Sequence, residues 1–196
     1  MNLYISSFDS MIWNENDDLM FKKLNYRQQN KCLKYKKTAD RKNYLYSRIL
    51  LRTYLPQYTG IPYQDIIFKR EKYGKPIIEK SDIYFNLSHT TGMTVLAIAS
   101  GKSVGIDVEY VRNISDTGYK IMKKCFHPEE IKYIHKKENK SFDEAFFTIW
   151  TRKEAILKRN GTGMICDMKA INTVSEENRM AIHNIFYGKY IIALCE

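Results

Sequence analysis

The sequence predicts an α+β fold with two lobes, and three observations lead to that prediction. Short apolar or alternating runs predict strands at 83–86 and within 92–110, whereas longer runs at helical spacing predict helices over 40–54 and 141–160. The segments follow the order strand, helix, strands, helix, strands, which does not match a parallel array of βαβ units. We therefore expect two α+β lobes that meet near Gly101, one over residues 1–100 and the other over residues 101–196.

Length and composition exclude several classes of protein. The 196 residues are 44% hydrophobic and 13% aromatic, which is too apolar for a disordered chain. The four cysteines lack CxxC spacing, so we expect neither a disulfide framework nor a structural zinc site at Cys32, Cys125, Cys166 and Cys195. The first 13 residues predict a strand rather than a signal peptide, and no segment has the roughly 20 apolar residues of a membrane helix. We expect a cytoplasmic protein without a membrane partner.

The charge is strongly positive. The chain has 32 Lys and Arg against 22 Asp and Glu, a net charge of +10, and nine of the basic residues fall between Lys22 and Lys42. Such a surplus favours an anionic partner, which can be nucleic acid, a phosphate-rich small molecule or an acidic protein. A merely compositional surplus of lysine is the alternative, so charge alone does not decide the function.

Each predicted element has its own signal. Between Asp40 and Tyr54 apolar side chains recur at helical spacing, and Pro56 marks the expected end of that helix. From Gly92, the apolar run MTVLAIA is followed by SGK and then by VGIDVEY, which predicts a hairpin. The second long helix begins with the capping-box spacing of Ser141 and Glu144 and is expected to stop at residue 161. Residues 164–194 predict two or three further strands.

Asp107 and Glu109 form the most informative local feature. Side chains alternate along the strand VGIDVEY, so the two acids share one face, with Cα atoms roughly 6.5–7 Å apart. Like charges this close are costly unless a cation joins them, and hard carboxylate oxygens suit magnesium. The pair therefore indicates either a metal site or a solvent-facing strand edge.

Trp150, Glu154 and Lys158 lie four residues apart on the second long helix and therefore share one stripe. In a functional interpretation, Glu154 completes the metal site and Lys158 meets a phosphate oxygen. The alternative is an ordinary i,i+4 ion pair worth about 0.3–0.5 kcal/mol, with Trp150 in the core. Both interpretations stay open on spacing alone.

Two short segments present polar groups at the ends of strands. The run FNLSHT at 85–90 offers one amide, two hydroxyls and one imidazole, which suit phosphate oxygens. Ser88 and His89 are adjacent on a strand and point to opposite faces, which argues against a nucleophile and base pair. The turn Tyr73-Gly74-Lys75-Pro76 presents one further lysine, a signal that is not specific by itself.

In this order and spacing, these segments resemble the signature blocks of a known family. FNLSHT, VGIDVE and WTRKEAILKRNGTG are similar to those of the 4′-phosphopantetheinyl transferases, and the surfactin-synthetase-activating (Sfp) subclass is the most similar. KYGKP at 72–76 and the basic stretch from Lys31 to Arg52 resemble the same subclass. The similarity covers about residues 30 to 165, and the length fits this subclass rather than the much shorter, trimeric holo-ACP-synthase type.

The resemblance implies a fold and a reaction. The fold has two similar, pseudo-symmetric α+β halves in one chain, with the active site in the cleft between them. In the reaction, a serine of an acidic acyl or peptidyl carrier protein attacks the phosphorus that bears the pantetheine arm of coenzyme A, and 3′,5′-ADP leaves. The chain is therefore expected to be a monomeric enzyme, a holo-[acyl-carrier-protein] synthase-type transferase with coenzyme A as co-substrate.

The resemblance also implies residue roles. Asp107, Glu109 and Glu154 are expected to bind Mg²⁺, with Mn²⁺ as the other candidate, against the pyrophosphate. The expected catalytic residues are Glu154, as general base, together with Asp107 and Lys158, whose ammonium stabilises phosphate oxygens. Lys158 thus belongs to both the catalytic and the coenzyme A-binding set.

The remaining coenzyme A contacts follow from the same resemblance. Ser88 and His89 are expected to bind its phosphates, with His89 and Lys31 together on the 3′-phosphate. Lys75 and the turn Tyr73-Gly74-Lys75-Pro76 are expected to flank the adenine and its phosphates. Gln28 stands where many relatives carry a basic residue, and the order at 41–43 leaves open which side chain there contacts coenzyme A.

The docking surface for the carrier protein and the role of one further acid follow less directly from the resemblance. A basic surface suits an acidic carrier protein. The segment from Tyr119 to Phe126, which mixes apolar residues with three lysines, is either a docking strip for the carrier or an amphipathic helix that covers the core. Glu130, in FHPEE, resembles a further acid of the family.

Two other functions remain as alternatives. An Asp-x-Glu strand followed by a helical Glu and Lys also matches the acid–acid–lysine sites of metal-dependent nucleases, but FNLSHT then has no role. A nucleic-acid-binding module on the Lys22–Lys42 stretch lacks a reading motif, and Tyr26 and Tyr35 are too few for a stacking platform. We therefore expect no nucleic-acid partner.

Overall fold

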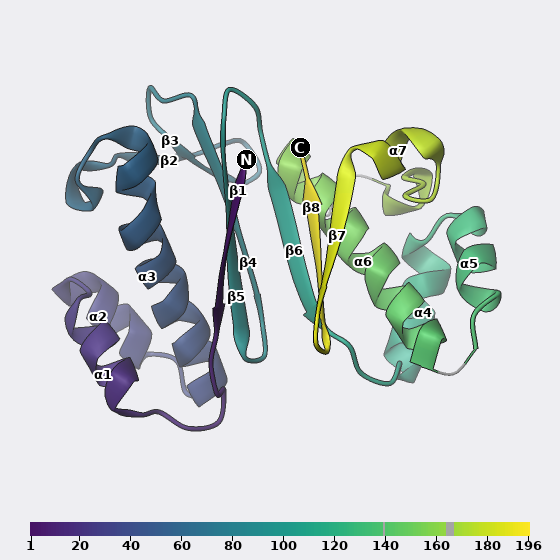
Figure 1. The fold of residues 1–196 in the computed structure, drawn as a ribbon, viewed down its shortest axis with the longest axis horizontal. Coiled ribbons are helices and arrows are strands. Elements are labelled where there is room, and N and C mark those ends of the chain that lie inside the picture. Colours follow the sequence, from purple (N-terminus) through teal and green to yellow (C-terminus); the bar gives the residue numbers. More distant parts are fainter. Residues whose placement is uncertain (139, 164–166) are drawn as a thin grey trace.

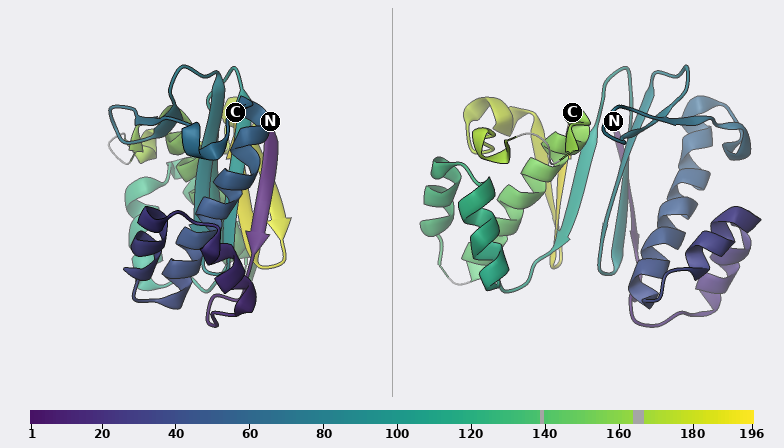
Figure 2. Two further views of the ribbon diagram at one scale, coloured as in Figure 1. Left: turned by 90° about the vertical axis from the view of Figure 1, so that its left-hand side faces the viewer. Right: turned by 180° about the vertical axis from the view of Figure 1, so that it is seen from behind.

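Two three-stranded antiparallel sheets lie face to face in the middle of the molecule, and each is covered on its outer side by one long helix (Figure 1). The computed structural model describes residues 1–138, 140–163 and 167–196. Seen from behind, the layers keep the same order, and both chain ends lie at one end of the sheets (Figure 2). None of the described helices is long and apolar enough to cross a membrane.

The N-terminal half contains the first sheet and a small two-stranded sheet. Its elements are β1 (Asn2–Ser7), α1 (Glu15–Lys22), α2 (Tyr26–Leu33), α3 (Thr38–Thr59), a 3-10 helix (Tyr63–Asp65), β2 (Phe68–Arg70), β3 (Pro76–Ile78), β4 (Ile83–Thr90) and β5 (Met93–Ser100). The C-terminal half contains β6 (Gly105–Tyr110), α4 (Asp116–Cys125), α5 (Pro128–His135), α6 (Lys140–Asn160), a 3-10 helix (Met168–Ala170), α7 (Glu176–Met180), β7 (Ile182–Tyr187) and β8 (Tyr190–Cys195).

Both halves have the same topology. Each begins with a strand, continues through two short helices and one long helix, and ends with a β-hairpin. The first strand pairs antiparallel with the last strand of its half, β1 with β5 and β6 with β8. The sheet orders are accordingly β1-β5-β4 and β6-β8-β7. The expected pair of pseudo-symmetric α+β halves is confirmed.

The predicted hairpin over 92–110 was wrong. β5 pairs with β4 and β1, whereas β6 belongs to the other sheet, and the SGK segment links the two sheets. β5 is buried along almost its whole length because it packs against α3 on one face and against β6 and β8 on the other. Face-to-face packing buries Val95 and Ala97 of β5, Ile106 and Val108 of β6, and Val104 just before β6.

The backbones of β6 and α6 approach each other closely at Gly105. A Cβ atom at Gly105 would lie 1.9 Å from the carbonyl oxygen of Ala155 and 2.4 Å from the amide nitrogen of Arg159. Only glycine allows this contact. Asp107 lies on the same face of β6 as Gly105, so the close approach brings the strand acid to the helix.

Two element boundaries differ from the expectation. α3 continues past Pro56 to Thr59 and ends where Gly60 adopts a left-handed conformation with φ 66°. Pro56 lies in the last turn, and its carbonyl accepts the hydrogen bond from the amide of Gly60 at 3.0 Å that closes the helix. α6 begins at Lys140, one residue before the predicted cap at Ser141. The described part of the tail forms two strands, within the expected two or three, together with a 3-10 helix and α7. Residues 164–166, with Cys166 among them, lie outside the described residues; the cysteines that are described are free.

Candidate active site

Asp107 lies at the centre of a polar contact between the two halves. Its side chain is buried on β6, on the face opposite the apolar core. Ser88 Oγ, on β4, donates a hydrogen bond to Asp107 Oδ1 at 2.8 Å, and Lys158 Nζ, on α6, lies 2.6 Å from the same oxygen. Lys158 Nζ also donates to Ser88 Oγ at 3.0 Å. Three of the predicted site residues therefore meet from three elements and from both halves.

Two carboxylate oxygens at this contact have no donor. Asp107 Oδ2 and Glu154 Oε1 are buried and accept no hydrogen bond from the protein. A buried carboxylate oxygen without a partner is costly, and it is the kind of oxygen that a hard cation such as Mg²⁺ binds. The three acids are not a preformed cage, since within the described ranges no three acidic, histidine or cysteine side chains converge as a metal centre. The two orphaned oxygens nevertheless fit the chemistry of a divalent cation.

The three carboxyl groups share one electrostatic environment. Burial raises the pKa of Glu154, and the charges of Asp107 and Glu109 raise it further against the pull of Lys158. Burial and then the charge of Asp107 raise the pKa of Glu109, while Arg112 opposes the shift from 3.3 Å. Glu109 is less enclosed than Asp107 and lies further along the strand. A divalent cation at this place would relieve the mutual repulsion.

A cavity of about 270 Å³ opens beside this contact. Its lining joins the predicted turn to α6 and to β4, and consists of Tyr73, Gly74, Lys75, Pro76, Asn86, Leu87, Glu154, Leu157, Lys158, Gly161 and Gly163. Predicted residues that are distant in the sequence thus line one cavity. A larger hollow of about 560 Å³ lies beside α4 and Trp150, and its lining includes none of the three predicted metal ligands.

The structure places the amine of Lys75 elsewhere than expected. Lys75 lines the cavity, but its Nζ donates to Ser103 Oγ at 2.5 Å, to Arg159 O at 2.8 Å and to Val104 O at 3.2 Å. The side chain is only 8% exposed, and burial lowers its pKa. Three protein acceptors hold the protons of the Lys75 ammonium in this structure, and its expected contact with phosphate stays a prediction.

His89 and Lys31 do not join the cavity. His89 is exposed at the end of β4. Partial burial of the imidazole, and then the positive charge of Lys158, lower its pKa. Lys31 is exposed on α2, with Nζ 5.4 Å from the ring centroid of Tyr44. It lines a separate basic hollow of about 530 Å³, together with Gln28 and Lys34. Their joint contact with one phosphate stays a prediction.

The segment from Tyr119 to Phe126 is mainly the helix α4. Met122 and Phe126 are buried in the core of the C-terminal half, so they do not face a partner. Lys120, Lys123 and Lys124 are exposed, and Ile121 is half-buried beside the larger hollow. The amphipathic-helix interpretation therefore holds for the apolar residues. Trp150 is half-buried against the same core.

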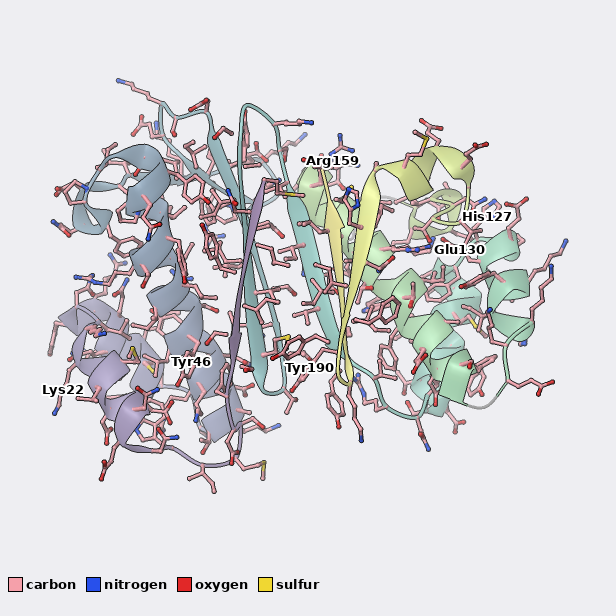
Figure 3. All side chains as sticks on the ribbon, in the orientation of Figure 1. Lys22, Tyr46, His127, Glu130, Arg159 and Tyr190 are labelled. Atoms are coloured by element: carbon pink, nitrogen blue, oxygen red, sulfur yellow. The ribbon has the colours of Figure 1, made fainter. Side chains whose placement is uncertain are left out.

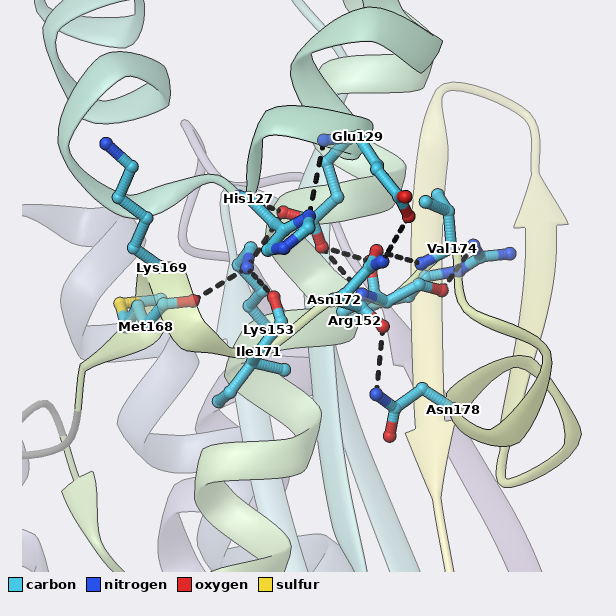
Figure 4. A network of polar contacts seen from close by, with 12 residues as sticks. His127, Glu129, Arg152, Lys153, Met168, Lys169, Ile171, Asn172, Val174 and Asn178 are labelled. Carbon is cyan, nitrogen blue, oxygen red and sulfur yellow. Dashed lines mark hydrogen bonds and ion pairs between the residues drawn. The ribbon is translucent and has the colours of Figure 1, made fainter.

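A buried ion pair next to the site was missed from the sequence. Lys153, which directly precedes Glu154, lies 2.8 Å from Glu130, and both side chains are fully buried. Figure 4 shows Lys153 among the polar contacts of this network. Lys153 Nζ also donates to the carbonyl oxygens of Met168 and Ile171, while Glu130 accepts from the amide of His127 and from Thr173. The His127-x-x-Glu130 spacing of a capping box was the available signal.

Asn86 is a second residue whose role was missed. Its Oδ1 accepts a hydrogen bond from the amide of Ile106 at 3.0 Å, which joins β4 to β6. This bond sets the strand with Ser88 beside the strand with Asp107. The amide in FNLSHT was noted in the sequence, but nothing local indicates that it binds a backbone group of the other half.

Two family models match the chain, and together they cover most of it. The model described as 4′-phosphopantetheinyl transferase superfamily matches residues 103–195. The model described as 4′-phosphopantetheinyl transferase, N-terminal, matches residues 13–101. The boundary between the matches falls at the link between the two sheets.

Several curated proteins are similar to this chain. The 4′-phosphopantetheinyl transferase gsp of Aneurinibacillus migulanus is 37% identical over 137 residues, which are 70% of this chain and 56% of gsp. HetI of Nostoc sp. is 34% identical over 63% of this chain and 54% of HetI. Sfp of Bacillus subtilis is 26% identical over 84% of this chain and 72% of Sfp. The chain thus spans a little over half the length of gsp and HetI.

Proposed function

Because the chain belongs to the 4′-phosphopantetheinyl transferase superfamily, we propose that it transfers the 4′-phosphopantetheine group of coenzyme A to a serine of a carrier protein. The serine oxygen bonds to the phosphorus that carries the pantetheine arm, the bond from this phosphorus to the bridging oxygen breaks, and 3′,5′-ADP leaves with that oxygen. The meeting of Lys158, Asp107 and Ser88 beside the cavity lined by residues 73–76 carries the proposal.

The three acids are the proposed metal ligands. Asp107 Oδ2 and Glu154 Oε1, which lack donors, would hold Mg²⁺ or Mn²⁺ with Glu109. A bound cation would neutralise the negative charge that develops on the pyrophosphate. The raised pKa values of Glu109 and Glu154 support this proposal, since burial and then the charge of neighbouring carboxylates disfavour the ionised form of both groups.

Glu154 and Lys158 are the proposed groups for the chemical step, and Asp107 supports them. Glu154 accepts the proton of the attacking serine hydroxyl, since its carboxylate lines the same cavity as Lys158. Lys158 donates hydrogen bonds to the phosphate oxygens in transit. Its position beside Ser88 orients the ammonium toward the same cavity that Glu154 lines.

Coenzyme A would lie along the boundary between the halves. The N-terminal half, residues 1–100, contributes Ser88 and His89 for the phosphates, and the backbone of the turn at Tyr73-Gly74-Lys75-Pro76 for the adenine. Lys31 remains a proposed ligand of the 3′-phosphate. The C-terminal half, residues 101–196, contributes the metal ligands and the two groups of the chemical step.

The partner we propose is an acidic acyl or peptidyl carrier protein. The exposed lysines of α4, Lys120, Lys123 and Lys124, offer the complementary charge. We further propose that the enzyme is a monomer and acts in the cytoplasm, where carrier proteins of fatty acid, polyketide and nonribosomal peptide synthesis are made.

One experiment separates this function from the nuclease alternative, which none of the comparisons supports. The protein is incubated with coenzyme A, Mg²⁺ and a panel of apo carriers, and in parallel with plasmid DNA. We expect a mass increase of one phosphopantetheine on at least one carrier and intact plasmid. Cleaved plasmid without carrier modification would instead support the nuclease.

A further inference from the structure

Lys75 and Ser103 tie three segments together at the end of α6. Lys75 lies directly before β3, in the turn from β2. Its three acceptors belong to the link between the sheets, to the residue directly before β6 and to α6. Ser103 Oγ accepts from Lys75 and donates to Arg159 O at 2.6 Å. The carbonyl of Arg159 therefore receives two side-chain donors, one from each side of the boundary between the halves.

The chemistry of a helix end explains this arrangement. Arg159 is the second-last residue of α6, so its carbonyl is one of four that lack an intrahelical partner. The helix dipole places negative charge at this end, which favours a cation. Arg159 lies at the end of α6 nearest the first sheet (Figure 3). An ammonium from the N-terminal half thus caps a helix of the C-terminal half.

The turn that carries Lys75 is itself braced against the chain beyond α6. A Cβ atom at Gly161 would lie 2.7 Å from Glu71 Oε2 and 3.3 Å from Lys75 Cδ, so the two segments are in direct contact. Within the turn, Arg70 Nη1 donates to Gly74 O at 2.7 Å, and the amide of Glu71 donates to Lys75 O at 2.9 Å. The turn therefore offers a fixed support for the last turn of α6.

We propose that Lys75 and Ser103 are positioning residues that hold the last turn of α6, and with it Lys158, in place for transfer. Lys158 directly precedes Arg159, so release of the Arg159 carbonyl loosens the ammonium that meets Asp107. The effect on rate rests on the transferase function proposed above. The Lys75 ammonium acts here through the helix and does not serve as a ligand of the coenzyme A phosphates.

The first test needs no enzymatic activity. Amide hydrogen exchange is measured for residues 155–160 in wild type, Lys75→Met and Ser103→Ala, with Lys102→Met as the control. Lys102 is exposed in the same link, so its variant removes a positive charge nearby without touching the helix end. We expect faster exchange at 155–160 in the first two variants and wild-type exchange in the control. Unchanged exchange in Ser103→Ala, which removes a single hydroxyl, overturns the proposal even where Lys75→Met fails to fold.

The second test separates positioning from phosphate binding. The Kd for coenzyme A is measured by calorimetry, and kcat by carrier modification. We expect kcat to fall about tenfold or more in both variants, since small displacements of reacting groups cost one to two orders of magnitude. The Kd should stay within about threefold, and the double variant should lose little more than the worse single one.

The contrary results are distinct. A Kd raised about tenfold or more in Lys75→Met alone, with wild-type kcat and exchange in Ser103→Ala, identifies Lys75 as a phosphate ligand and overturns the proposal. If wild type modifies no carrier but exchange at 155–160 responds as expected, the transferase function fails while the tie at the helix end stands.

Discussion

Lys158 contacts one carboxylate oxygen of Asp107 and leaves the other without a partner. Its Nζ lies 2.6 Å from Oδ1, whereas the buried Oδ2 accepts no hydrogen bond. The lysine therefore serves as an internal counter-ion for part of the carboxylate charge. The remaining charge, on Asp107 Oδ2 and on Glu154, is where a divalent cation would act.

Asp107→Asn should abolish transfer and preserve the fold. The substitution keeps the shape and the hydrogen bond from Ser88 but removes the charge that binds both Lys158 and the cation. We expect kcat/KM to fall by about 10³-fold, measured as the rate of carrier mass increase. Asp82→Asn, which changes an exposed carboxylate, is the matched control. Near wild-type transfer by Asp107→Asn at equal Mg²⁺ would exclude Asp107 as an essential ligand.

Lys158→Met should make the protein more dependent on metal for its stability. Without the ammonium, the buried Asp107 carboxylate loses its counter-ion, and the metal-free protein should be destabilised by about 1–3 kcal/mol. Because Mn²⁺ would then relieve a larger repulsion, the rise in Tm on adding Mn²⁺ should exceed that of wild type. Lys102→Met serves as the control. An equal or smaller rise in the Lys158 variant contradicts the counter-ion role.

Glu154→Gln should stabilise the metal-free protein at neutral pH. The pKa of Glu154 is raised on folding, so between its unfolded and folded pKa values the folded state binds more protons. Stability is therefore lost as pH rises through this window, and the loss is complete above the folded pKa. Urea unfolding in EDTA at several pH values should show higher stability above this window and a flatter profile for the variant. If stability depends on pH in Glu154→Gln as it does in wild type and in the exposed control Glu144→Gln, ionised Glu154 does not destabilise the folded protein.

Lys153→Met should destabilise the protein more than any surface lysine variant. It leaves Glu130 as a buried charge without its cation, a change that costs about 3–5 kcal/mol in comparable sites. The network around Glu130 also fixes α5 and the segment at 171–173 against α6, so the variant should loosen the helix beside Glu154. Urea unfolding measures the effect, with exposed Lys132→Met as the control. A decrease in the free energy of unfolding below about 1 kcal/mol would show that the ion pair contributes little to stability.

Local periodicity predicted which of these residues share a face, and the family resemblance then assigned the three acids to one site. The two-residue alternation of β6 set Asp107 and Glu109 on one face, and the four-residue spacing of α6 set Glu154 beside Lys158. These relations depend only on the geometry of one strand and one helix. The contact of Lys158 with Asp107 followed because Gly105 lets the helix approach the strand.

Contacts between distant segments could not be predicted in the same way. The pairing of β5 with β4 rather than β6 depends on which apolar faces meet in the folded core. The acceptors of Lys75 are a linker hydroxyl and two backbone carbonyls, and no side-chain pattern marks a carbonyl as a partner. Asn86 is a similar case, because its partner is the amide of Ile106.

The central claim is a transfer with coenzyme A as donor, and its stoichiometry is the most direct test. Wild-type protein, coenzyme A, Mg²⁺ and apo carriers from fatty acid, polyketide and nonribosomal peptide systems are combined, and carrier mass and 3′,5′-ADP are measured together. The account predicts one 3′,5′-ADP for each phosphopantetheine found on a carrier serine. No mass change on any carrier, under conditions where Sfp of Bacillus subtilis modifies the same preparations, would contradict it.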